Sequence, residues 1–198
     1  NGENSIAIAS GANGSLSPED IRKAQPTIEK GDILLMQLEI PIETVEYAAQ
    51  IASEQGIKVI LNPAPARALS NKLLQNLYMI IPNETEAEIL SGIKVTDWES
   101  ARRAADIISA KGVDIVVITL GSKGALIKEK DTFHEVPVPK VKAVDTTAAG
   151  DTFCGALCVA LSEDVLNAVK FANKCASITV TRMGAQPSLP YRKEIDVL

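Results

Sequence analysis

The sequence predicts an α/β protein in which helices cover both faces of a mostly parallel β-sheet and an antiparallel hairpin forms one edge of that sheet. Three observations support this prediction. Short apolar runs alternate along the chain with segments whose apolar residues recur at helical spacing. Two strand-like segments, 125–128 and 132–136, are separated by only three residues, as in a hairpin. A turn of small residues at 148–150 leads directly into an apolar helical segment.

The first part of the chain is predicted to form three strands and two helices. Residues 4–10 alternate apolar and polar side chains, as a half-buried strand does, and the Ser-Pro-Glu-Asp run at 17–20 opens a helix. The continuous apolar runs at 32–37 and 57–61 are typical of strands that are buried on both faces. Between these two runs, residues 42–55 carry apolar side chains at helical spacing.

The second part of the chain continues the alternation of strands and helices. Strands are predicted at 77–81 and 114–120, and the second of these is rich in β-branched residues. The predicted hairpin follows it. Helices are predicted at 84–91, 97–111, 148–161 and 164 to about 181.

The composition is that of a soluble globular domain. The 198 residues are 46% hydrophobic and 23% charged, which provides enough apolar surface for a core. A net charge of −5 argues against nucleic-acid binding, which needs clustered positive charge. The sequence contains neither a signal peptide nor an apolar run long enough to span a membrane, so we expect a cytoplasmic protein without a membrane partner. The three cysteines lack the spacing of a zinc site and are predicted to be buried thiols.

The turn of small residues and the helix after it have the features of a phosphate-binding site. Ala148, Ala149 and Gly150 have almost no side chain to block a ligand, and backbone N–H groups at the start of a helix attract anions. A carboxylate at this position repels phosphate, so Asp151 needs another role. The role that fits is accepting a proton from a hydroxyl group as that hydroxyl attacks phosphorus. The alternative is that Asp151 and Thr152 only cap the helix.

Polar residues follow several predicted strands at the point where each strand ends. They are Glu39, Asn83, Glu86, the segment 119–124 and Asp151. Ligands of α/β sheets bind beyond the carboxyl ends of the strands, so we expect these residues to share one rim. Each also has a purely local interpretation. Asn83 and Glu86 have the spacing of a capping box, and the glycines in 119–124 are typical of a turn.

Residues 145–153, Asp-Thr-Thr-Ala-Ala-Gly-Asp-Thr-Phe, resemble the signature of the ribokinase-like family of sugar kinases, many of whose members carry Gly in place of Ala148. Further segments resemble the same family in its order: 37–39, 62–65, 83–88, 119–124 and 182–188. The resemblance implies a three-layer αβα, Rossmann-like fold. It also implies ATP-dependent phosphorylation of D-ribose at its 5-hydroxyl.

The resemblance implies roles for individual residues. Asp151 matches the catalytic base, which also contacts the sugar, and the turn at 148–150 matches an anion hole. Glu39 matches a sugar-binding carboxylate, and Glu86 matches an acidic residue tied to Mg²⁺. The residues that match the nucleotide site are Asn83, Thr119, Leu120, Gly121, Ser122, Lys123, Gly124, Gly150 and Asn173. Asn173 stands where members of the family can have a histidine near the adenine.

A site for a monovalent cation, K⁺, is also implied. The matching residues are Asp145, Thr147, Thr179, Arg182, Gly184 and Ser188, with carbonyl oxygens from the residues between them. Oxygen ligands suit a hard cation. An ion beneath the turn at 148–150 would help to fix the N–H donors of that turn.

The resemblance covers only the C-terminal two thirds of the family's sequence. The first strand, a glycine-rich G-G-x-x-x-N segment that grips the sugar, and most of a β-sheet lid do not precede Asn1. We therefore interpret residues 1–9 as a remnant of the lid and 10–198 as the nucleotide-binding core, and we expect a homodimer only for the complete protein. Two alternatives remain: a kinase of another sugar or of a nucleoside, and a truncated, non-catalytic nucleotide-binding module.

Overall fold

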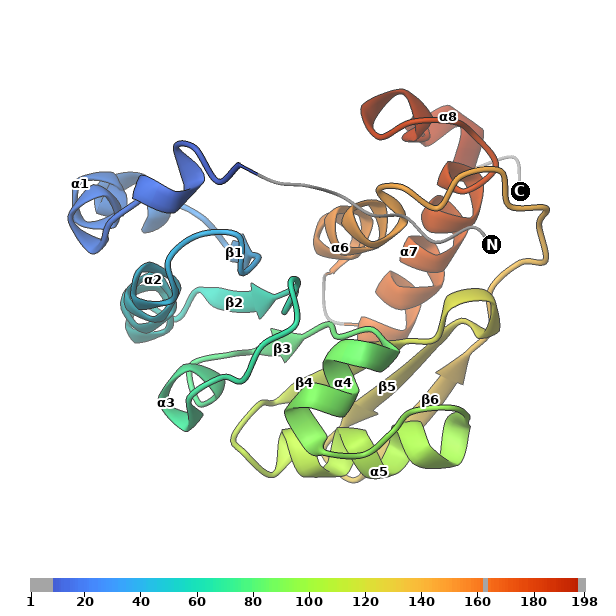
Figure 1. Cartoon of the computed structure of the whole chain (residues 1–198), viewed down its shortest axis with the longest axis horizontal. Coiled ribbons are helices and arrows are strands. Elements are labelled where there is room, and N and C mark those ends of the chain that lie inside the picture. The colour runs from blue at the N-terminus through green and yellow to red at the C-terminus, as the bar shows by residue number, and fades with distance from the viewer. Residues whose placement is uncertain (1–8, 162–163, 196–198) are drawn as a thin grey trace.

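The structure is a computed structural model that describes residues 9–161 and 164–195 (Figure 1). The predicted strand at 4–10 and the predicted lid remnant at 1–9 lie almost wholly outside these residues, so both stay predictions.

The described residues form one mixed sheet of six strands in the order β1 to β6 (Figure 1). β1 to β4 are parallel and β5 and β6 form an antiparallel hairpin, which confirms the predicted fold class. The strands are β1 Ile33–Met36, β2 Lys58–Leu61, β3 Met79–Ile80, β4 Ile115–Thr119, β5 Ala125–Glu129 and β6 Thr132–Val136. Met36 pairs with Leu61, and Leu61 pairs with Ile80, so the first three strands end at one edge of the sheet.

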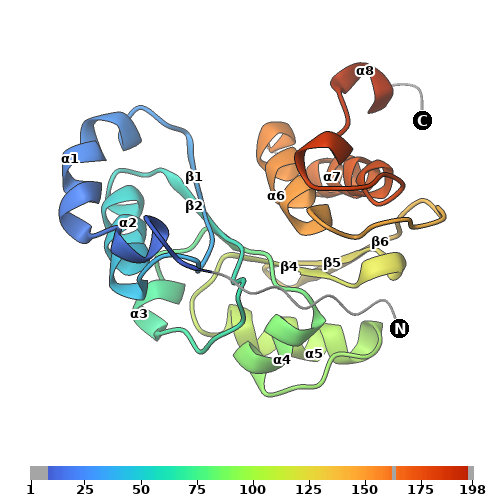
Figure 2. The ribbon, with the colours of Figure 1, turned by 45° about the horizontal axis from the view of Figure 1, so that its top comes forward.

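Helices cover both faces of the sheet, so the sheet is the middle one of three layers (Figure 2). One face carries α2 Ile42–Glu54, α3 Asn71–Leu74, α4 Glu84–Ser91 and α5 Trp98–Ser109, and the other carries α6 Ala149–Ala160 and α7 Val165–Thr179. α1 Pro18–Ile28 packs on α2 at the outside of the molecule, and α8 Arg192–Ile195 follows α7. Short 3₁₀ helices lie at Asn13–Ser15, Gly121–Lys123 and Gln186–Ser188.

Two hydrophobic cores lie on the two faces of the sheet because alternate strand residues point in opposite directions. In β2, Val59 and Leu61 join the core that contains the alanines of α2 and α5, whereas Ile60 joins the core under α6 and α7. This arrangement is why the central strands are continuous apolar runs in the sequence.

Each helix and strand predicted within the described residues is present, and α4 begins and ends where it was predicted. Two one-turn helices, α3 and α8, were not predicted. The prediction that the strand at 32–37 is buried on both faces is wrong. β1 lies at the edge of the sheet that the described residues form, and Leu35 on its α6 side keeps 39% of its surface exposed.

Candidate active site

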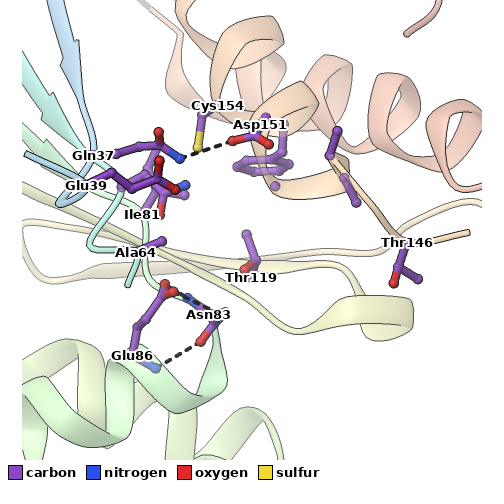
Figure 3. A pocket seen from close by; sticks show the side chains of 15 residues that line it. Gln37, Glu39, Ala64, Ile81, Asn83, Glu86, Thr119, Thr146, Asp151 and Cys154 are labelled. Atoms are coloured by element: carbon purple, nitrogen blue, oxygen red, sulfur yellow. Dashed lines mark hydrogen bonds between the residues drawn. The ribbon is translucent and has the colours of Figure 1, made fainter. Parts of the chain in front are cut away.

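A cleft of about 280 Å³ opens at the carboxyl ends of the strands, beside the start of α6 (Figure 3). Eight of the predicted site residues line it: Glu39, Asn83, Glu86, Thr119, Ala148, Ala149, Gly150 and Asp151. They come from four separate stretches of the chain. The expectation that the strand ends share one rim is therefore confirmed for these residues.

The start of α6 leaves backbone donors free. Its N-cap is Ala148, which makes no side-chain cap hydrogen bond, and the Thr152 hydroxyl donates to the Ala148 carbonyl oxygen at 2.8 Å. Within the described part of the chain, the N–H groups of Gly150 and Asp151 have no hydrogen-bond partner. Such donors at the positive end of a helix dipole suit an anion.

Ala148 has φ +61°, in the left-handed region that favours glycine. An alanine there costs about 1–2 kcal/mol. This geometry gives the physical reason why glycine suits the position in the family that the motif resembles.

Asp151 faces the cleft and does not cap its helix. Its Oδ1 accepts a hydrogen bond from Gln37 Nε2 at 3.2 Å, across the cleft from β1 (Figure 3). No side chain caps α6, so the capping interpretation of Asp151 is wrong in this structure. The exposed carboxylate remains accessible to a substrate hydroxyl.

Asn83 and Glu86 form a capping box and also line the cleft. Glu86 N–H donates to Asn83 Oδ1 at 2.9 Å, and Asn83 N–H donates to Glu86 Oε2 at 2.9 Å. Burial raises the pKa of the Glu86 carboxyl, and the hydrogen bond from the Asn83 backbone opposes that change. The local interpretation is thus confirmed, and a carboxylate in the cleft still fits a hard cation such as Mg²⁺.

Thr119, the last residue of β4, lines the cleft, and a tight loop follows it. Leu120 is buried, Gly121–Lys123 is a 3₁₀ helix, and Lys123 Nζ donates to the Thr96 carbonyl oxygen at 2.6 Å. Gly124 has φ +112° and closes the loop by accepting from Leu120 N–H at 2.8 Å. Residues 120–124 are not among those that line the cleft.

Asn173 lies apart from the cleft. It is 5% exposed, and its Nδ2 donates to the Val136 carbonyl oxygen at 3.0 Å, which ties α7 to the end of β6. The structure therefore gives Asn173 a packing role, and a contact with adenine stays a prediction.

The residues of the predicted K⁺ site come from the loop before α6, the end of α7 and the loop after α7, and Asp145 joins the two loops. Its Oδ1 accepts from Thr147 N–H and its Oδ2 from Gly184 N–H, each at 2.9 Å. The hydrogen bonds from Thr147 and Gly184 lower the pKa of Asp145. Thr179 is buried, and its hydroxyl is 3.0 Å from that of Thr152. These links connect the loops to α6.

Two further members of the predicted K⁺ site have partners nearby. Ser188 is buried and its hydroxyl donates to the Ala185 carbonyl oxygen at 2.6 Å, whereas the Arg182 guanidinium pairs with Glu194. Arg182 could therefore offer a cation only its carbonyl oxygen. Apart from the Arg182 guanidinium, the side chains of the predicted set that could contact a cation offer oxygen atoms, and oxygen ligands fit a hard monovalent cation.

The prediction of site residues missed Gln37 and Asn62, which also line the cleft. Both follow strand ends, which was the signal that identified Glu39 and Asn83. Asn62 is 9% exposed and forms a hydrogen bond with the thiol of Cys154, whose pKa burial raises to about 12. Cys154 and Cys175 are buried as predicted, and Cys158 is half-buried.

The described residues contain no group of three or more His, Cys, Asp or Glu side chains arranged to hold a metal ion. None of the described helices has the length and apolar character that crossing a membrane requires.

Residues 1–192 match the family model described as pfkB family carbohydrate kinase. The ribokinase of Haemophilus influenzae is 50% identical to the chain over 194 residues, which are 97% of this chain and 63% of the relative. The deoxyribokinase of Salmonella typhi is 42% identical, over 96% of this chain and 63% of the relative. A structure of Arabidopsis thaliana ribokinase complexed with ribose and ATP matches with a TM-score of 0.89 and 32% identity, covering 98% of this chain and 64% of that one. The chain thus spans less than two thirds of these relatives.

Proposed function

The chain belongs to the pfkB family of carbohydrate kinases, and we propose that it carries the nucleotide site and the catalytic base of an ATP-dependent kinase that phosphorylates D-ribose at the 5-hydroxyl. The observation that supports this most is the position of Asp151. Its carboxylate lies in the cleft beside the free N–H groups at the start of α6 and on the same rim as Glu39. The similarity to ribokinases, at up to 50% identity among the relatives above, supports ribose as the acceptor.

The proposed chemistry is an in-line transfer between two oxygens. The 5-hydroxyl oxygen of ribose attacks the γ-phosphorus of ATP, the new O–P bond forms, and the bond from phosphorus to the β,γ-bridging oxygen breaks to release ADP. Asp151 accepts the hydroxyl proton. The N–H groups of Gly150 and Asp151 stabilise the negative charge that develops on the transferred group.

The other cleft residues hold the substrates in this proposal. Glu39 accepts hydrogen bonds from sugar hydroxyls. The nucleotide site is formed by Asn83, Thr119 and the loop up to Gly124. Asn173 lies near the adenine of the nucleotide in this proposal. Glu86 would hold Mg²⁺, which when bound neutralises charge on the phosphate oxygens.

The acceptor is tested with a panel of sugars and two proteins: the 198-residue chain, and a chimera in which the N-terminal third of the Haemophilus influenzae relative precedes residue 1. We expect the chimera, with ATP and Mg²⁺, to form ribose 5-phosphate faster than it phosphorylates 2-deoxyribose, fructose or a nucleoside. We expect the 198-residue chain to bind ADP and to turn over barely above background, because positioning of the acceptor accounts for much of the rate.

Two results would change the proposal. Faster phosphorylation of 2-deoxyribose would assign the alternative acceptor, for which the 42% identity to a deoxyribokinase is the supporting observation. Nucleotide binding by calorimetry without turnover in either protein would favour the non-catalytic module.

A K⁺ site formed by Asp145, Thr147, Thr179, Arg182, Gly184 and Ser188 is part of the same proposal. If K⁺ binds there, replacing Na⁺ by K⁺ at constant ionic strength should raise the activity of the chimera several-fold, and Asp145→Ala should abolish the response. Asp131→Ala, on the turn of the hairpin, is the control. A rate that does not depend on the cation would assign these loops a structural role only.

A homodimer of the complete protein also stays a proposal. It rests on pairing through the lid, and residues 1–8 lie outside the described structure.

A further inference from the structure

One side-chain contact links the edge strand of the sheet to the helix that carries the proposed base. Gln37 follows β1 and lies 114 residues before Asp151, yet its Nε2 donates to Asp151 Oδ1 at 3.2 Å (Figure 3). Among the described residues, Asp151 Oδ2 has no hydrogen-bond partner. The contact therefore engages one carboxylate oxygen and leaves the other free.

The backbone around Gln37 is held on both sides. Asn62 N–H donates to the Met36 carbonyl oxygen at 2.9 Å, and Leu38 N–H donates to the Ala64 carbonyl oxygen at 2.8 Å. Gln37 is half-buried, whereas Asp151 is exposed. The backbone from which the Gln37 side chain extends is thus held, while the carboxylate that it contacts is exposed to solvent.

Another helix of the same chain shows a different position that an acidic side chain can take at the third residue of a helix. Asp151 is the third residue of α6, as Glu86 is of α4, and Glu86 turns back to the N–H group at the start of its own helix. An acidic side chain at this position is attracted to those donors. At α6 the same movement would bring the Asp151 carboxylate to the N–H group of the N-cap residue Ala148. There it would lie beside the N–H groups of Gly150 and Asp151 that are proposed to bind the transferred phosphoryl group.

We propose that Gln37 is a positioning residue that holds the Asp151 carboxylate away from the start of α6, so that the N–H groups stay available to phosphate and Oδ2 stays available to the sugar hydroxyl. The inference rests on the proposed function, because it assumes that Asp151 is the base. It assigns a role to a residue that itself transfers no proton.

The first measurement is the orientation of the Asp151 side chain in the 198-residue chain. Three-bond couplings to Cγ, measured by NMR, report the χ1 rotamer. We expect one rotamer in the parent chain and rotamer averaging or a different rotamer in Gln37→Leu. Gln50→Leu is the matched control, because Gln50 Nε2 also donates to a carboxylate, that of Glu54 at 2.9 Å, on a helix away from the cleft. An unchanged rotamer in Gln37→Leu would overturn the proposal.

The second measurement is phosphoryl transfer to ribose in a single turnover by the chimera, in excess over labelled ATP. Gln37→Leu should lower the rate constant about 10- to 100-fold, the usual cost of a misplaced reacting group, with ADP affinity changed by less than about two-fold. Gln37→Glu keeps the size but removes the donor and adds a like charge, so its loss should be at least as large. In the Asp151→Asn background, Gln37→Leu should cause no further loss.

The results separate this inference from the proposed function. A loss that persists in the Asp151→Asn background would show that Gln37 acts on the substrate or the fold, and it would overturn the positioning role. If Asp151→Asn itself leaves the rate unchanged while the rotamer still responds to Gln37→Leu, the proposed base is wrong and the contact is structural. If the rate of the chimera itself lies at background, the rotamer measurement in the 198-residue chain decides.

Discussion

We expect Asp151→Asn to lower ribose phosphorylation by the chimera about 10²- to 10⁴-fold, the usual contribution of a positioned general base. Asn has the same size as Asp and lacks the negative charge, so ATP affinity should be retained or improved. Ribose 5-phosphate formation and ATP binding by calorimetry measure the two effects. Asp164→Asn is the control, because Asp164 caps α7 and Asn is also a good N-cap.

A turnover within tenfold of the parent would contradict the role of Asp151 as the base. Retained turnover together with lower stability would instead assign Asp151 to the folding of α6. The control separates these outcomes from a general effect of removing one negative charge.

The second large effect concerns stability. A Cβ atom at Gly124 would lie 2.1 Å from the Val136 carbonyl oxygen and 2.9 Å from the Pro137 Cα, and φ there is +112°. Both obstacles are backbone atoms, so no side chain can rotate away. We expect Gly124→Ala to lower the free energy of unfolding by about 2–5 kcal/mol, through a strained backbone and overpacking. Urea unfolding followed by circular dichroism measures it.

Gly56→Ala is the matched control for Gly124→Ala. Gly56 also has a positive φ, +75°, but a Cβ atom there meets nothing within 4 Å. Its substitution should therefore cost only the backbone strain, about 1–2 kcal/mol. Equal losses in the two variants would show that the loop after β4 can move away from β6, and the packing argument would fail.

The sequence by itself determined the local elements of this protein. Asn83 and Glu86 predicted the start of α4 because a capping box is made by residues three apart. The alternation of apolar runs with helical periodicity predicted the parallel strands, and the short connection between 125–128 and 132–136 predicted the hairpin. The motif at 145–153 placed the small residues and the carboxylate at the start of α6.

Only the tertiary structure decided which distant groups meet. The contact between Gln37 and Asp151 depends on how α6 lies against the edge strand, and no spacing rule relates residues 114 apart. The same holds for the contact of Asp145 with Gly184 and for the burial of Asn173 against β6.

The exposure of β1 was also beyond the sequence. An apolar run does not reveal whether its strand is central or at an edge, because burial depends on which helices cover it. The one-turn helices α3 and α8 are too short for a periodic signal. Local hydrogen bonds and periodicity act over a few residues and can be seen in the sequence, whereas side-chain contacts across the cleft are set by the packing of whole layers.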